Sequence, residues 1–172
     1  MIFRLTAEAR GMAGRAYELA VRQKARSVEE GHLLIALIEH DGSAARALRD
    51  EGVDLERLIE GALAALADST LDGEALACVG IDLGALKRRL DASFSAGALD
   101  RAVRARRVLR YSPQARQALE VAHRQATNLG TSKITEQLLL ASLLRPGRVS
   151  SVLVADQGID PEAVRARVLA PG

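Results

Sequence analysis

The segment HLLIALI, residues 32–38, decides the fold because it occurs a second time in altered form. When the sequence is shifted against itself by 106 positions, this segment falls on LLLASLL, residues 138–144, without a gap. Two further segments match at the same shift: LTAEAR (5–10) on YSPQAR (111–116), and GVDLE (52–56) on GIDPE (158–162). An internal match at one fixed period indicates a duplicated structural unit.

Each copy carries the signals of four helices. Thr6 and Ser112 are good N-caps for a first helix, and Pro113 suits the first helical position of the second copy. The segments 32–38 and 138–144 are apolar on most sides, so each should form the central core helix of its copy.

The second half of each copy is marked by glycines and aspartates. Glycine predicts a turn that ends the second helix, at Asp41-Gly42 in the first copy and at Pro146-Gly147 in the second. A short third helix should then end in a left-handed residue at Gly52 and at Gly158. The fourth helix of each copy should be capped by an aspartate, Asp54 in the first and Asp160 in the second.

These signals predict an all-α fold, a pseudo-twofold duplicated four-helix repeat with an inserted helix between the repeats. We expect the first repeat at residues 1–67, an insert and linker at 68–110, and the second repeat at 111–172, in one compact domain. The helix of the insert is expected at about residues 83–94.

Composition limits the class of protein. Hydrophobic residues make up 48% of the 172 residues and aromatic residues only 2%, so a sizeable core must consist of Leu, Val, Ile and Ala, which favours helices. A net charge of +2 does not by itself indicate a nucleic-acid-binding protein. Residues 1–10 lack the apolar region of a secretory signal, and the longest strongly apolar run is too short to span a membrane. We therefore expect a cytoplasmic protein.

The sequence lacks the common catalytic and metal-binding motifs. No lysine follows a glycine, so there is no P-loop, and neither a G-x-S-x-G nor an H-E-x-x-H motif is present. We therefore expect no enzyme activity, no cofactor and no metal site. His32 should have a structural role, and the pair Glu29-Glu30 should lie at a helix end on the solvated surface.

An arginine-rich run from Arg101 to Arg110 leaves two interpretations open. It is either a solvated linker or a docking segment for an acidic protein or nucleic acid. No aromatic residues interleave with the arginines, which weakens the version with single-stranded nucleic acid. A helical nucleic-acid-associated or transcription-linked protein that uses this run is therefore the alternative function.

Taken together, the motifs resemble the Clp N-terminal (Clp R) repeat domain, which precedes the AAA+ motors of ClpA, ClpB and ClpC. The resemblance rests on RLTAEAR (4–10), GHLLIALI (31–38), AARAL (44–48) and, in the second copy, YSPQAR (111–116). The segment 75–101 is similar to the insert of free-standing actinobacterial proteins that lack the motor domains.

The resemblance implies a non-catalytic accessory or regulator of the Clp protease–chaperone system. Its partners would be Clp components, adaptors, substrates or a peptide-like ligand such as a cyclic peptide. No membrane would be involved, and nucleic acid is not the expected partner. The ligand would lie in a groove between the repeats, for which the sequence offers seven residues: Ile2, Phe3, Arg10, Glu30, Tyr111, Arg116 and Glu136.

One departure from the family concerns phosphoarginine. Family members that bind it use a glutamate of a G-T-E-H motif in each copy, and the aligned residues here are Gly31 and Gln137. Glu30 and Glu136 lie one residue earlier, a step that rotates a helical side chain by about 100°. We therefore predict that phosphoarginine binds weakly or not at all.

Overall fold

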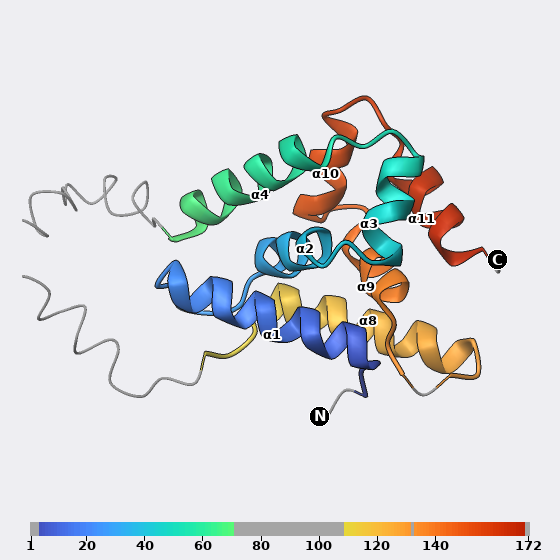
Figure 1. Ribbon diagram of the computed structural model, residues 1–172, viewed down its shortest axis with the longest axis horizontal. Helices are drawn as coiled ribbons and strands as arrows, with labels where there is room; N and C mark the ends of the chain where they lie inside the picture. Colours follow the sequence, from blue (N-terminus) through green and yellow to red (C-terminus); the bar gives the residue numbers. More distant parts are fainter. Residues whose placement is uncertain (1–3, 71–108, 132, 171–172) are drawn as a thin grey trace, which may run out of the picture.

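The computed structural model describes residues 4–70, 109–131 and 133–170, and this part of the chain is helical (Figure 1). The first four helices are α1 (Ala7–Arg22), α2 (Glu30–Glu39), α3 (Ser43–Asp50) and α4 (Leu55–Thr70). The others are α8 (Pro113–Asn128), α9 (Glu136–Leu143), α10 (Val149–Ala155) and α11 (Pro161–Leu169). The predicted all-α class is confirmed, whereas the predicted insert helix at 83–94 lies outside the described residues.

The backbone repeats its unusual conformations at the predicted period. Left-handed residues in the described part of the chain occur in three pairs, and the members of each pair lie 106 positions apart: Lys24 and Gly130, Asp41 and Gly147, Gly52 and Gly158. The left-handed ends of α3 and α10 at Gly52 (φ 81°) and Gly158 (φ 79°) are those predicted. In the turn before α3, Asp41 is the left-handed residue and Gly42 is the N-cap of the helix.

The predicted caps begin the helices. The Thr6 hydroxyl accepts from the Ala9 amide at 3.2 Å, and the Ser112 hydroxyl accepts from the Ala115 amide at 3.1 Å. The Asp54 carboxylate accepts from the Arg57 amide at 3.1 Å at the start of α4. At the start of α11 the Asp160 carboxylate accepts from the Glu162 amide at 3.0 Å. Each bond satisfies an amide that the helix itself leaves without an acceptor.

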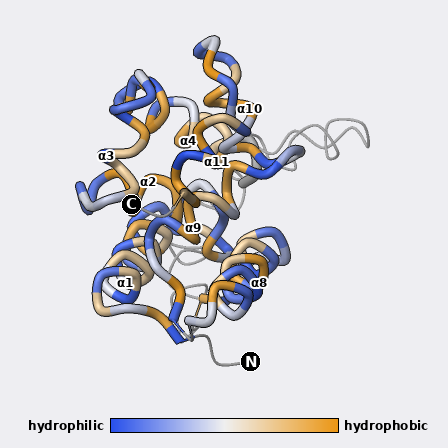
Figure 2. The backbone as a smooth tube through the Cα atoms, turned by 90° about the vertical axis from the view of Figure 1, so that its right-hand side faces the viewer, coloured by the Kyte–Doolittle hydropathy of each residue, from blue (hydrophilic) through white to orange (hydrophobic). Residues whose placement is uncertain are grey.

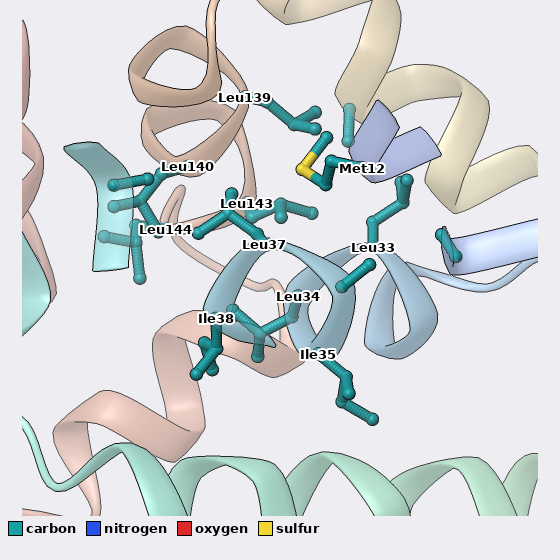
Figure 3. Packing of buried hydrophobic residues seen from close by; sticks show 14 of the residues in the cluster. Met12, Leu33, Leu34, Ile35, Leu37, Ile38, Leu139, Leu140, Leu143 and Leu144 are labelled. Carbon is teal, nitrogen blue, oxygen red and sulfur yellow. The ribbon is translucent and has the colours of Figure 1, made fainter. Parts of the chain in front are cut away.

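The core lies between the two second helices. Figure 3 shows Leu37 of α2 beside Leu143 of α9, and Met12 of α1 between Leu33 and Leu139. All five side chains are fully buried. Buried alanines on the inner faces of α1 and α8 allow these helices to approach α2 and α9 closely. Seen from two directions, α1 and α8 form one layer, α2 and α9 the middle layer, and α3, α4, α10 and α11 the third (Figures 1 and 2).

The two repeats also exchange short extended segments. Leu5 pairs with Ile134 in a parallel bridge, and Tyr111 pairs with Val28 at the positions equivalent by the repeat. Four backbone bonds hold these bridges: Thr6 N to Ile134 O at 3.1 Å, Ile134 N to Arg4 O at 2.8 Å, Ser112 N to Val28 O at 3.0 Å, and Val28 N to Arg110 O at 2.9 Å. Each repeat therefore completes the hydrogen bonding of the other.

None of the described helices is long and apolar enough to cross a membrane.

Candidate functional site

Two buried carboxylates cross from one repeat to the other. Glu136 begins α9, is 5% exposed, and reaches the N-terminus of α3 in the first repeat. Its Oε2 accepts from the Ser43 amide at 3.1 Å and from the Ser43 hydroxyl at 3.3 Å, and its Oε1 lies 3.0 Å from Nε2 of His40. The positive end of the α3 dipole stabilises a carboxylate at this position.

Glu30, the equivalent residue in α2, makes the reciprocal connection. It pairs with the guanidinium of Arg148, the N-cap of α10, which also donates to the Gln114 carbonyl at 3.1 Å. Burial raises the pKa of Glu30, while the charge of Arg148 acts in the opposite direction. The sequence interpretation of Glu30 as a surface charge is wrong, because the side chain is enclosed by the second repeat.

Glycines make room for these contacts. A Cβ atom at Gly42 would lie 2.1 Å from Oε2 of Glu136, so the carboxylate occupies the space that a side chain would need. The equivalent position in the second repeat is Arg148, which fills the corresponding space with its own side chain. A Cβ atom at Gly31 would lie 2.8 Å from Cγ of Leu66, so a glutamate at this position would displace the Leu66 side chain of α4.

Two cavities lie side by side along the outer face of α8. The larger, about 560 Å³, extends from α8 to the turn before α10, and Glu30 and Arg148 form part of its wall. The smaller, about 320 Å³, is lined by residues of α8 and of the segment before it, among them Tyr111 and Arg116. Gln117 and Glu120 line both cavities, so the two adjoin each other. Burial raises the pKa of the Tyr111 phenol.

The structure brings together only part of the predicted groove. Tyr111, Arg116 and Glu30 line the cavities beside α8. Arg10 is exposed on α1 and Glu136 reaches α3, and neither lines these two cavities. Ile2 and Phe3 lie outside the described residues. Sequence reasoning missed Arg148, for which the only available signal was a charged residue at the position equivalent to Gly42.

His32 has the structural role that the sequence predicted. Its Nδ1 accepts from the Glu29 amide at 2.9 Å and completes a capping box at the start of α2, and its Nε2 lies 3.1 Å from the Gln23 side-chain oxygen. Burial lowers the pKa of His32, because the charged ring is poorly solvated there. Within the described residues no group of three or more His, Cys, Asp or Glu side chains is placed to hold a metal ion.

Fold and site together define a duplicated helical bundle with shallow cavities on its surface. Residues 4–72 match the Clp repeat (R) N-terminal domain family. This match is to the family that the resemblance in the sequence predicted. No curated protein sequence matches the chain.

Several solved structures share the fold. The Hsp104 N-terminal domain from Candida albicans has a TM-score of 0.67 and 14% identity, with 96% of this chain and 89% of that chain covered. The N-terminal domain of the caseinolytic protease associated chaperone ClpD from Arabidopsis thaliana has a TM-score of 0.59 and 14% identity, with 98% of this chain and 95% of that chain covered. A structure from investigations of a malarial protein secretion system has a TM-score of 0.66 and 13% identity, with 96% of this chain and 92% of that chain covered.

Proposed function

We propose that this chain is a non-catalytic protein- or peptide-binding module that acts as an accessory or regulator in a Clp protease–chaperone system. The observation that carries the proposal is the match of residues 4–72 to the Clp repeat N-terminal domain. The Clp-type fold over the described part of both repeats supports it.

The binding surface that we propose is the adjoining pair of cavities beside α8. It contains Tyr111 and Arg116, two residues of the predicted groove, with Glu30 in its wall. Its volume lies within the range of about 300–1,000 Å³ that is usual for ligand sites. The binding roles of Ile2, Phe3, Arg10 and Glu136 stay predictions.

The test is a reconstituted degradation assay with a purified Clp-type chaperone, its protease and a model substrate. We expect added chain to bind the chaperone or the substrate and to change the degradation rate. The Tyr111→Ala variant should weaken this effect, whereas Arg57→Ala, a change at an exposed position on α4, should not. Absence of both binding and any change in rate would contradict the proposal.

The structure gives a physical reason to expect little affinity for phosphoarginine. Glu30 is already paired with Arg148, and Glu136 is already bound to Ser43 and lies beside His40. An incoming guanidinium would have to displace these partners first, and each displaced contact reduces the net gain from binding. Titration calorimetry should show no micromolar binding of phosphoarginine. Micromolar binding that is lost in both Glu30→Ala and Glu136→Ala would show this prediction to be wrong.

A further inference from the structure

The outer face of α8 carries positive charge without partners. Four exposed arginines line the two cavities: Arg110, Arg116, Arg124 and Arg145. Within the described part of the chain, no carboxylate lies at ion-pairing distance from any of them. Arg148 differs from these four, because Glu30 neutralises it. Glu120 is then the one acidic lining residue that no described arginine neutralises.

The arrangement of this surface follows the helix. Pro113, Gln117, Glu120 and Arg124 lie at helical spacing on one face of α8, and all four line a cavity. The distance from the first to the last is about 17 Å at 1.5 Å per residue. An extended peptide covers that length with about five residues at roughly 3.3 Å each. The exposed side-chain amides of Gln114 and Gln117 are available to hydrogen-bond such a backbone.

We propose that the face of α8 binds an acidic peptide segment in an extended conformation. The proposal deepens the proposed function, on which it rests, by naming the chemistry of the partner. Carboxylates of the peptide would pair with Arg116 and Arg124 on α8 and with Arg145 across the larger cavity. Arginine suits this task because its planar guanidinium binds a carboxylate through two parallel hydrogen bonds.

A nucleic acid fits the same surface less well. Glu120 lines both cavities and would face a phosphate backbone that passes through them. Single-stranded nucleic acids also gain much of their affinity from stacking on aromatic rings, and Tyr111 is the one aromatic residue that lines the two cavities. A peptide can place its acidic side chains beside the arginines and leave an uncharged residue beside Glu120.

The test uses fluorescence anisotropy with the full chain and a labelled seven-residue peptide that carries four glutamates. A peptide with glutamine in place of each glutamate and a short oligothymidylate are measured in parallel. We expect the acidic peptide to bind, the glutamine peptide to bind roughly tenfold more weakly, and the affinity for the acidic peptide to fall as salt is raised.

Charge reversal makes the test specific to the surface. In the triple variant Arg116→Glu, Arg124→Glu and Arg145→Glu, the affinity for the acidic peptide should fall by roughly tenfold or more. The same variant should gain affinity for a matched lysine peptide. The control variant Arg46→Glu with Arg57→Glu changes exposed arginines on α3 and α4 and should bind the acidic peptide like the wild type. If circular dichroism shows that the triple variant has lost helix, the corresponding glutamine variant replaces it.

Three results would overturn the inference: equal affinity for the glutamate and glutamine peptides, unchanged binding in the triple variant, or tighter binding of the oligothymidylate. None of these results would bear on whether the chain binds a Clp chaperone. If the chain changes the rate of Clp-dependent degradation but does not bind acidic peptides, this inference is wrong and the proposed function is unaffected.

Discussion

At the scale of single residues, the unusual chemistry of this chain is concentrated where one repeat touches the other. Glu30 and Glu136 are buried acidic side chains, and each is held by groups from the opposite repeat. A buried carboxylate needs such partners because loss of its water shell is costly. The identity of Gly42 follows from the position of Glu136, since the carboxylate leaves no space for a Cβ atom.

The close approach at Gly42 gives the first prediction from the structure. Gly42→Ala should lower the free energy of unfolding by about 1–3 kcal/mol, because the new methyl group displaces Glu136 from α3. Urea denaturation measures the change. Gly11→Ala is the control, since no atom lies within 4 Å of a Cβ there, and it should stabilise α1 by about 0.5–1 kcal/mol. Equal effects of the two substitutions would contradict the steric argument.

His32 should make stability depend on pH. Because burial lowers its pKa below the ordinary value of 6.5, the unfolded state binds more protons than the folded state between these two values. Stability should therefore fall as the pH is lowered through 6.5. Protonation of Nδ1 also removes the acceptor for the Glu29 amide.

This prediction is measured by urea denaturation at pH 7.5 and pH 5.5. The wild type should lose more stability between the two values than His32→Asn, in which the amide oxygen can still accept the hydrogen bond without titrating. The same loss in both proteins would assign the pH dependence to other groups.

At the scale of the elements, helix starts are fixed by local hydrogen bonds. Thr6 and Ser112 occupy equivalent positions and accept the same bond from the residue three positions later. Such a cap needs only a hydroxyl at the right place in the sequence, so it was recognisable before the structure was known. The central helices α2 and α9 were equally recognisable from their nearly continuous apolar composition.

Removal of one cap should destabilise the protein by a limited amount. Ser112→Ala leaves the Ala115 amide without its acceptor and should lower the free energy of unfolding by about 1 kcal/mol. Ser112→Thr should retain most of the stability, because threonine makes the same bond at position 6. Chemical denaturation of the three proteins tests this, and a threonine variant as unstable as the alanine variant would count against the cap.

At the scale of the whole molecule, the repeats are interlocked rather than merely adjacent. Each repeat supplies one strand-like segment to a bridge and one buried carboxylate, Glu30 or Glu136, to the other repeat. In addition, α3 packs on α11 and α10 packs on α4. Separation of the repeats would leave these polar groups without partners and expose the faces of α2 and α9. We therefore expect the described bundle to unfold as one unit.

Tyrosine fluorescence can test this directly, because the chain has two tyrosines and no tryptophan. Tyr17 lies in α1 of the first repeat and Tyr111 precedes α8 of the second. Denaturation of Tyr17→Phe reports on the second repeat, and that of Tyr111→Phe on the first. In each variant the fluorescence midpoint should agree with the midpoint from circular dichroism. Fluorescence that changes at a different denaturant concentration from the loss of helix would show that the repeats unfold independently.

The amino-acid sequence by itself determined the helices of the described residues, their caps and the duplication, because these depend on signals a few residues apart or on one fixed period. Only the tertiary structure decided that Glu30 is buried against Arg148, that Glu136 caps α3, and that Tyr111 and Arg116 share a surface with Arg124 and Arg145. The physical reason is that these contacts join residues distant in the chain. They form when two helical units dock, and no local preference specifies the partners.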